Sequence, residues 1–225
     1  MTSKTTNSRR DFLKMTAITG GGLVLGFNWF SAEAAVPVVI SDSAMAAGNI
    51  GFNSYLSIAT DGTVTIMSPN PELGQNIITS FPMVVAEELE ADWKKVKVLQ
   101  ANLDNKFDRQ LTGGSGAVPH SWKLLRNAGA TAKFMLIEAA AKVWSVPSSE
   151  CSAANSFVIH SKSGKKLSYG ELAEAASKIP VPASVKLKDR KDFKLIGKSV
   201  RNVENRKIVT GQPLFGLDFY RDGMV

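Results

Sequence analysis

Residues 54–89 read SYLSIATDGTVTIMSPNPELGQNIITSFPMVVAEEL, and the fold prediction starts from this stretch. Apolar and polar residues alternate over 54–59 and again over 63–68, and the Asp61-Gly62 pair between them is a strong hairpin signal. After a glycine-containing turn, apolar residues recur every three or four positions from 77 to 89, which predicts a helix. Pro82 is expected to bend that helix because proline removes one backbone hydrogen bond.

The next segments continue the mixture of strands and helices. Alternation over 95–100 predicts a strand, and the polar, glycine-rich residues 102–116 predict a loop. The longest helical pattern runs over 121–144, where alanines on the apolar stripe permit close packing.

A second hairpin is predicted from strands at 157–159 and 166–169, which flank Ser163-Gly164. Ser168 and Glu171 have the spacing of a capping box, which predicts a helix that continues to Lys178. Together these elements predict an α/β fold, with a mixed sheet and packed helices.

The composition limits the chemistry that the chain can perform alone. The chain has 225 residues, of which 44% are hydrophobic and 21% charged, as in ordinary folded proteins. One cysteine excludes an intramolecular disulfide and a four-cysteine iron–sulfur site, and two histidines are too few for a three-histidine zinc centre. Any redox centre must therefore come from a bound cofactor or a partner.

The net charge of +7 raises the question of nucleic-acid binding. Trp93, Trp122 and Trp144 are not interleaved with a basic stripe, so we interpret them as packing residues and expect no nucleic-acid partner. From 186 to 207, nine basic residues face three acidic ones. We expect a solvated linker there, and a docking surface for an anionic partner is the alternative.

The amino terminus resembles a twin-arginine export signal. Ser8-Arg9-Arg10-Asp11-Phe12-Leu13-Lys14 precedes an uncharged stretch over 15–32 and an Ala-Glu-Ala cleavage site at 32–34. A membrane anchor fits less well, because glycine and polar residues interrupt the stretch. Residues 1–34 are therefore expected to be a signal peptide read by the twin-arginine translocation machinery. The mature protein would be periplasmic, possibly associated with the membrane, and loaded with its cofactor before export.

Two glycine-containing turns are the candidate binding elements. In the first, Gly74 and Gln75 precede the helix predicted at 77–89, in which Thr79 lies in the first turn. In the second, Gly113, Gly114 and Ser115 precede the long helix. Free amides at a helix start attract anions, so both turns are predicted to converge on one pyrophosphate.

The pattern assigns no functional role to His120, His160 or Cys151. His120 and His160 are expected at the surface, with a phosphate contact as the alternative for His120. Cys151 is expected to be a small buried hydrophobic residue, because nothing in the pattern marks either histidine as its base.

Several segments resemble the molybdopterin-binding large subunit of the xanthine oxidase family, in the form of the isoquinoline 1-oxidoreductase β-subunit. The resemblance covers nearly all of residues 8–225. The segments that carry it are TDGTVT at 60–65, PELGQ at 71–75, VAEEL at 85–89, GGS at 113–115, LRNAGA at 125–130, AAAKVW at 139–144, KLIGK at 194–198 and KIVTGQPLFGLD at 207–218.

The resemblance implies a site residue by residue. Gly74, Gln75 and Thr79 match a turn that contacts molybdopterin cytosine dinucleotide, although Asn76 replaces the last glycine of that turn. Gly113, Gly114 and Ser115 match a loop that binds the pterin phosphates. The family's catalytic glutamate has no counterpart, so no catalytic residue and no metal ligand is assigned.

The resemblance also implies a domain order and a reaction. Residues 35–183 would form the molybdopterin-binding-type domain, and 184–225 a basic linker with the incomplete start of a hammerhead α/β domain. The complete enzyme would be a molybdenum hydroxylase that oxidises N-heterocycles or aldehydes with water-derived oxygen. A small subunit would carry the [2Fe–2S] clusters, and a c-type cytochrome is a plausible acceptor. The chain is interpreted as the amino-terminal part of that subunit, inactive alone. The alternatives are an exported binding or scaffold module without catalysis and an inactive truncated fragment.

Overall fold

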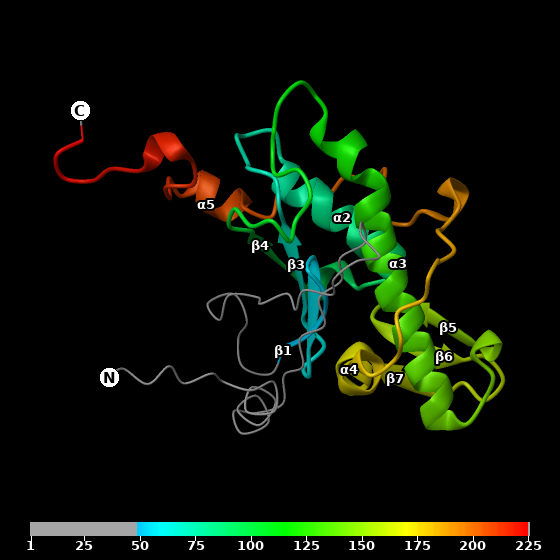
Figure 1. Cartoon of the computed structure of the whole chain (residues 1–225). Helices are drawn as coiled ribbons and strands as arrows, with labels where there is room; N and C mark the ends of the chain where they lie inside the picture. The colour runs from blue at the N-terminus through cyan, green and yellow to red at the C-terminus, as the bar shows by residue number, and fades with distance from the viewer. Residues whose placement is uncertain (1–48, 225) are drawn as a thin grey trace, which may run out of the picture.

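A computed structural model of the chain describes residues 49–224, which form two small sheets and a group of packed helices (Figure 1). The prediction of a mixed α/β fold is therefore confirmed. The proposed signal peptide at 1–34 lies outside the described residues. In the part of the chain that the structure describes, no helix is long and apolar enough to cross a membrane.

The first sheet has four strands in the order β1-β2-β3-β4, with bounds β1 Asn49–Asn53, β2 Leu56–Ala59, β3 Val64–Ser68 and β4 Val96–Gln100. The predicted hairpin is β2–β3, which is antiparallel, and the turn between them is closed by Thr63 N–H donating to Asp61 Oδ1 at 2.8 Å. β4 pairs with β3 in parallel, so Ser68 and Gln100 end the two strands at the same edge. β1 was not predicted.

Two helices join and cover this sheet. α2 (Ile77–Leu89) lies between β3 and β4 in the sequence and contains Pro82. α3 (Ala117–Trp144) packs along α2 (Figure 1) and begins four residues before the predicted start. Pro119 is compatible with this earlier start, because the first-turn N–H groups of a helix have no partner within it. The core between helices and sheet includes Phe52, Ile66, Phe81, Leu125, Met135 and Leu136.

The second sheet lies at the carboxyl end of α3 and has the order β5-β6-β7, with bounds β5 Cys151–Ala154, β6 Phe157–His160 and β7 Lys166–Ser168. The hairpin β6–β7 and the capping box are confirmed. Ser168 N–H donates to Glu171 Oε2 at 2.7 Å and Glu171 N–H donates to Ser168 Oγ, which starts α4 (Tyr169–Ser177). β5 was not predicted, although it pairs along β6.

The pairing of β5 with β6 explains why two predictions, the exposure of His160 and the burial of Cys151, are wrong. His160 is buried rather than at the surface, because β5 and Trp144 cover it. Its ring nitrogens lie 2.7 Å from Ser163 Oγ and 3.0 Å from Glu150 Oε2. Cys151 is only partly buried, because it begins β5 at the rim of the sheet. The short 3-10 helices η1 (Trp93–Lys95) and η2 (Ser148–Glu150) lead into β4 and β5.

Trp93, Trp122 and Trp144 all pack against the core, as predicted. The Trp122 ring meets Phe193 edge-on at 6.4 Å between centroids, and the Arg126 guanidinium lies 5.6 Å from the Trp122 ring. These contacts tie α3 to the segment that follows α4.

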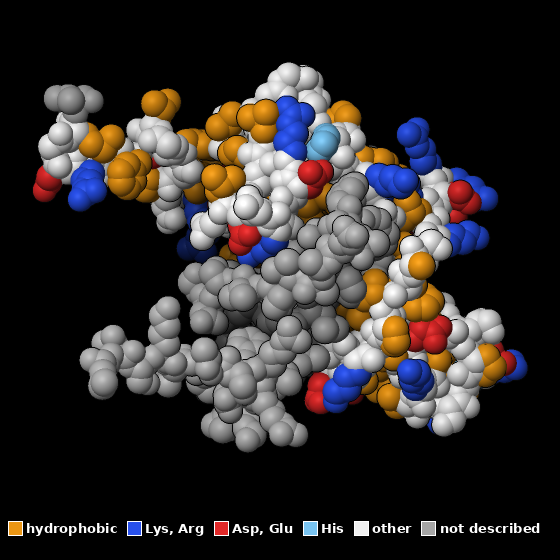
Figure 2. All heavy atoms as spheres, in the orientation of Figure 1, with side chains coloured by type: hydrophobic (Ala, Val, Ile, Leu, Met, Phe, Trp, Pro, Cys, Tyr) orange, Lys and Arg blue, Asp and Glu red, His pale blue; other side chains and the backbone are white. Residues whose placement is uncertain are grey.

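The prediction of a solvated linker at 186–207 is wrong for part of this segment. The Lys188 side chain is largely buried and forms ion pairs with Glu87 of α2 and with Glu90 in the loop after it. The main chain on either side of η3 (Arg190–Asp192) is bound to glutamates of α2, while the Lys191 side chain is exposed. Figure 2 shows basic side chains on the outer side of this segment. The charge pattern predicted exposure, but the buried carboxylates of Glu87 and Glu88 accept hydrogen bonds from main-chain N–H groups of this segment.

Beyond this segment, the chain runs past the end of β3 and then away from the body (Figure 1). α5 (Asn205–Val209) and η4 (Gly216–Asp218) lie on this extension, where Leu217, Phe219 and Tyr220 are exposed. Figure 2 shows hydrophobic side chains along it. The domain boundary predicted at 183/184 stays a prediction.

Candidate functional site

The first glycine turn, residues 71–76, connects β3 to α2 and is organised by Glu72. The Glu72 carboxylate accepts hydrogen bonds from the N–H groups of Gly74 at 2.7 Å, Asn76 at 3.0 Å and Ile78 at 2.9 Å. The prediction that these amides are free is therefore wrong. A carboxylate from the same turn already neutralises the positive end of α2.

The polar side chains that the sequence singled out near this turn also have partners within the chain. Gln75 braces its own turn: its Nε2 donates to Pro71 O at 3.1 Å and its Oε1 accepts from Leu73 N–H at 2.7 Å. Thr79 is buried, and its Oγ1 accepts from Val203 N–H at 3.1 Å. Thr79 thus anchors the carboxyl-terminal segment beside the turn.

Asn76 explains why a glycine is expected at this position. Asn76 is the N-cap of α2 and has φ 68° and ψ 27°, in the left-handed region. Asparagine tolerates this region better than other residues with a side chain, and glycine adopts it without strain. Asn76 therefore holds the turn in a backbone conformation that glycine also adopts.

We expect Asn76→Gly to change the free energy of unfolding by no more than about 0.5 kcal/mol, and Asn76→Val to lower it by about 1–2 kcal/mol. Asn76 Oδ1 is buried without a hydrogen-bond partner, so replacing the side chain with that of glycine breaks no hydrogen bond to this oxygen. Urea unfolding measures both changes, with Asn105→Val in an exposed loop as the control. A larger cost for Asn76→Gly would contradict a purely conformational role.

The second glycine turn is open. Gly116 N–H donates to Gly113 O at 3.1 Å, and the two residues between them have positive φ, 59° for Gly114 and 54° for Ser115. Within residues 49–224 no acceptor takes the N–H groups of Gly113, Gly114 and Ser115. A Cβ atom added to Gly113 or Gly114 would meet nothing within 4 Å. This turn has the donors and the space that an anion requires.

His120 lies in the first turns of α3, close in sequence to this turn, and is exposed as predicted. Its Nε2 is 2.8 Å from Asp108 Oδ2, so this nitrogen is engaged by a carboxylate. The arrangement gives no support to the alternative in which His120 contacts a phosphate.

The two turns lie side by side, as their convergence requires. Thr112 Oγ1 donates to Pro71 O at 2.8 Å, and Asn70 Nδ2 donates to Leu111 O at 2.8 Å. A third link joins Gln110 Nε2 to Pro69 O at 3.1 Å. Residues about forty positions apart in the sequence are therefore held together at the edge where β3 and β4 end.

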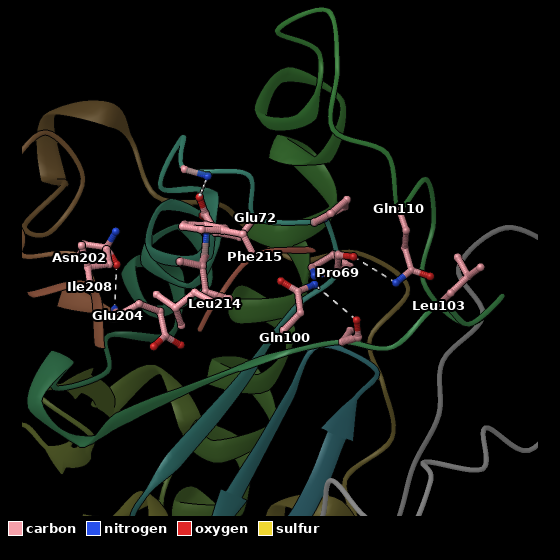
Figure 3. Close-up of a pocket in the computed structure, with 14 residues that line it drawn as sticks. Pro69, Glu72, Gln100, Leu103, Gln110, Asn202, Glu204, Ile208, Leu214 and Phe215 are labelled. Carbon is pink, nitrogen blue, oxygen red and sulfur yellow. Dashed lines mark hydrogen bonds between the residues drawn. The ribbon is translucent and has the colours of Figure 1, made fainter. Parts of the chain in front are cut away.

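A pocket of about 390 Å³ opens at this edge, between the first turn and the carboxyl-terminal segment (Figure 3). Its lining is Pro69, Pro71, Glu72, Gly74, Ile78, Gln100, Ala101, Leu103, Gln110, Asn202, Glu204, Ile208, Leu214 and Phe215. Two carboxylates and three carboxamides lie among apolar walls, and no lysine or arginine lines the pocket. Of the predicted site residues, Gly74 is the one in the lining.

Sequence reasoning missed Gln100, Gln110 and Asn202. Gln100 had a usable signal, because ligands often bind where parallel strands end. Gln110 and Asn202 had none, since a polar residue in a loop does not reveal its neighbours. Within the described part of the chain, no group of three or more His, Cys, Asp or Glu side chains is arranged to hold a metal ion.

Comparison with known proteins agrees with this arrangement. The molybdopterin cofactor-binding domain family matches residues 21–211. The chain is 30% identical over 263 residues to the isoquinoline 1-oxidoreductase subunit beta of Brevundimonas diminuta, covering 97% of this chain and 32% of that protein. It is 31% identical to the membrane-bound aldehyde dehydrogenase [pyrroloquinoline-quinone] of Gluconacetobacter polyoxogenes, covering 97% of this chain and 28% of that one.

Among solved structures, quinoline 2-oxidoreductase from Pseudomonas putida 86 aligns with 58% of this chain and 17% of its own, with a TM-score of 0.45 and 19% identity. The chain spans about a third of the length of the curated relatives.

Fold and site together define an α/β unit with two linked glycine turns at the end of a parallel strand pair. The family match identifies the class further: the chain belongs to the molybdopterin cofactor-binding domain family. This confirms the resemblance inferred from the sequence.

Proposed function

We propose that this chain is the cofactor-binding part of an exported molybdenum hydroxylase that oxidises N-heterocycles or aldehydes. The observation that carries the proposal is the open turn at Gly113–Ser115, held beside the Gly74 turn by hydrogen bonds between the two loops. The names of the curated relatives support the substrate classes. The bound molybdenum cofactor would supply the hydroxylation itself, with oxygen derived from water.

The two turns would hold different parts of the cofactor. The N–H groups of Gly113, Gly114 and Ser115 would hold a phosphate, because no acceptor among residues 49–224 takes them and a Cβ added at either glycine meets nothing within 4 Å. The first turn would contact another part of the cofactor, with Gly74 in the pocket lining and Gln75 and Thr79 supporting its wall. The molybdopterin cytosine dinucleotide form, taken from the family resemblance, would supply both parts.

The remaining parts of the proposal concern partners and location. A chain with one cysteine cannot ligate [2Fe–2S] clusters, so a small iron–sulfur subunit would receive the electrons. A c-type cytochrome would be the onward acceptor. The twin-arginine signal would direct the loaded protein to the periplasm, with association at the membrane surface. The chain would be the amino-terminal portion of a larger subunit.

Hydrogen exchange of the purified chain tests the phosphate site. Adding inorganic pyrophosphate or cytidine diphosphate is expected to slow exchange at the amides of Gly113–Ser115 several-fold. The hairpin turn at Ser163-Gly164 is an internal reference, because it is also glycine-containing and exposed. Equal protection at both turns, or none at either, would contradict the proposal and favour a scaffold module.

A matched pair of variants sharpens the test. Gly114 and Gly164 have φ 59° and 68°, and an added Cβ meets nothing within 4 Å at either position. Valine at either site should therefore cost a similar amount of stability, about 1–2 kcal/mol. Only Gly114→Val should weaken pyrophosphate binding, by about tenfold.

A further inference from the structure

A cluster of three polar side chains lies at the second sheet, far from both glycine turns. The open turn at Gly113–Ser115 directly precedes α3, and the second sheet lies at the other end of this helix (Figure 1). α3 has 28 residues, which corresponds to a length of about 40 Å. The cluster is therefore separate from the pocket and from the turns that would hold the cofactor.

The cluster is built by the end of β6 and the turn that follows it. His160 is the last residue of β6, and its buried ring lies with Nδ1 2.7 Å from Ser163 Oγ and Nε2 3.0 Å from Glu150 Oε2. Gly164 N–H donates to His160 O at 2.9 Å, and the φ of 68° at Gly164 lets the chain turn back. This turn places the Ser163 hydroxyl on the imidazole.

The carboxylate of Glu150 selects one form of the neutral imidazole. The Lys162 ammonium, followed by His160, holds the pKa of the Glu150 carboxyl below its ordinary value, so Glu150 is ionised near neutral pH. A carboxylate only accepts hydrogen bonds, so the ring proton lies on Nε2 and Nδ1 keeps its lone pair. The Ser163 hydroxyl can then donate to Nδ1. A hydroxyl bound to a base that a third group orients is the arrangement of an activated nucleophile.

The nucleophile is open to solvent, while its base is covered. Ser163 is exposed, whereas β5 and Trp144 cover the His160 ring. Lys165 N–H lies 3.4 Å from Ser163 Oγ and adds a weak second contact that holds this oxygen in place. Among residues 49–224, no acceptor takes the N–H groups of Lys162 and Ser163. These donors are available to the oxygen that becomes negative when a carbonyl carbon is attacked.

We propose that Ser163 is a nucleophilic site that accepts an acyl group from small activated esters, with His160 as its general base and Glu150 as a positioning residue. A bond forms between Ser163 Oγ and the acyl carbon, and the bond from that carbon to the leaving oxygen breaks. The Oγ proton passes to His160 Nδ1 and then to the leaving oxygen, so an alcohol is released. Water then attacks the acyl-serine in the same way, which releases the carboxylic acid and restores the hydroxyl.

The position of Ser163 sets the class of substrate. An exposed turn offers little surface on which to bind a long acyl chain, so the reactivity of the ester has to replace binding energy. Small esters with a good leaving group meet this requirement. The reaction needs no oxidant and no cofactor, so it goes beyond the proposed function and does not depend on it.

The first test uses the purified full chain and para-nitrophenyl acetate. We expect the unaltered chain to release para-nitrophenol about tenfold faster than Ser163→Ala, which is less than the hundredfold or more typical of general-base catalysis because the ester is not bound. Ser161→Ala is the matched control and should retain the rate. Ser161 is exposed on the same turn, but the ring nitrogens of His160 contact Ser163 and Glu150.

The second test locates the covalent bond. After reaction of the unaltered chain with phenylmethylsulfonyl fluoride, peptide mapping by mass spectrometry should find the adduct on Ser163 ahead of Ser161. His160→Gln should slow this labelling about tenfold, because the base is lost. Glu150→Gln should slow it without lowering the final labelled fraction. A merely structural role of Glu150 would change the unfolding midpoint but leave the labelling rate of the folded chain unaltered.

Three results would overturn the inference: equal ester hydrolysis by the unaltered chain and Ser163→Ala, equal labelling of Ser161 and Ser163, or a labelling rate that His160→Gln does not change. Labelling of the unaltered chain needs no substitution, so it decides the matter even if a variant fails to fold. Loss of pyrophosphate protection at Gly113–Ser115 would contradict the proposed function alone, because the two sites share no residue.

Discussion

Replacing Glu87 with alanine should lower the free energy of unfolding by about 3–5 kcal/mol, the range for breaking one side of a buried ion pair. The Glu87 side chain is buried on α2 and pairs with Lys188. It also accepts the N–H groups of Lys194 at 3.0 Å, Leu195 at 2.6 Å and Ile196 at 2.9 Å. Without the carboxylate, three main-chain donors lose their partner, and the Lys188 ammonium keeps only its ion pair with Glu90.

The same cluster predicts a pH dependence. Burial by itself would raise the pKa of Glu87, but the Lys188 ammonium and the three N–H groups hold that pKa below its ordinary value of 4.5. A lowered pKa in the folded state contributes stability above the unfolded value and loses it as the pH falls through the folded value. The stability gap between the unaltered chain and Glu87→Ala should therefore be constant above about pH 5 and shrink below pH 4.5.

Denaturant unfolding across this pH range measures both effects. Glu174→Ala is the control, because Glu174 forms an exposed ion pair with Lys178 four residues away, at 2.8 Å. Such a pair contributes about 0.5 kcal/mol or less. If the two glutamate variants lost the same stability, the role assigned to Glu87 would be wrong.

A second large effect is expected for Gly129→Ala, with a loss of about 3 kcal/mol from overpacking. An added Cβ at Gly129 would stand 2.3 Å from Val85 O and 3.0 Å from Glu88 Cβ, where α3 crosses α2. Alanine would otherwise favour the helix by about 1 kcal/mol, so a net loss isolates the clash between the helices.

Thermal or urea unfolding of Gly129→Ala gives the measurement. Gly216→Ala is its control, because a Cβ there meets nothing within 4 Å and the residue has no positive φ. That control should be neutral or slightly stabilising. A Gly129→Ala chain as stable as the original would show that the helices can separate at no cost.

The regular elements were predictable where a local pattern repeats several times. The hairpin around Asp61-Gly62, α2 and the capping box at Ser168 each depend on residues close in the sequence, and all were found. β1 and β5 were missed because short strands without strong alternation are recognised only by the strand beside them.

The candidate site was predictable in part. Both glycine turns were identified from composition, and their adjacency followed from both preceding a helix in one small unit. The role of Glu72 was not foreseen, because a glutamate two residues before a glycine does not reveal that its carboxylate turns back onto the amides. Lys188 was likewise read as one more surface charge.

By itself, then, the sequence determined the α/β class, the family and the two turns, since these depend on local periodicity and on motifs contiguous along the chain. Only the tertiary structure decided which donors and acceptors are already taken. Glu72 occupies the amides of the first turn, while Glu87 binds a segment about a hundred residues away. Hydrogen-bond partners separated by such distances are set by packing, which no local pattern encodes.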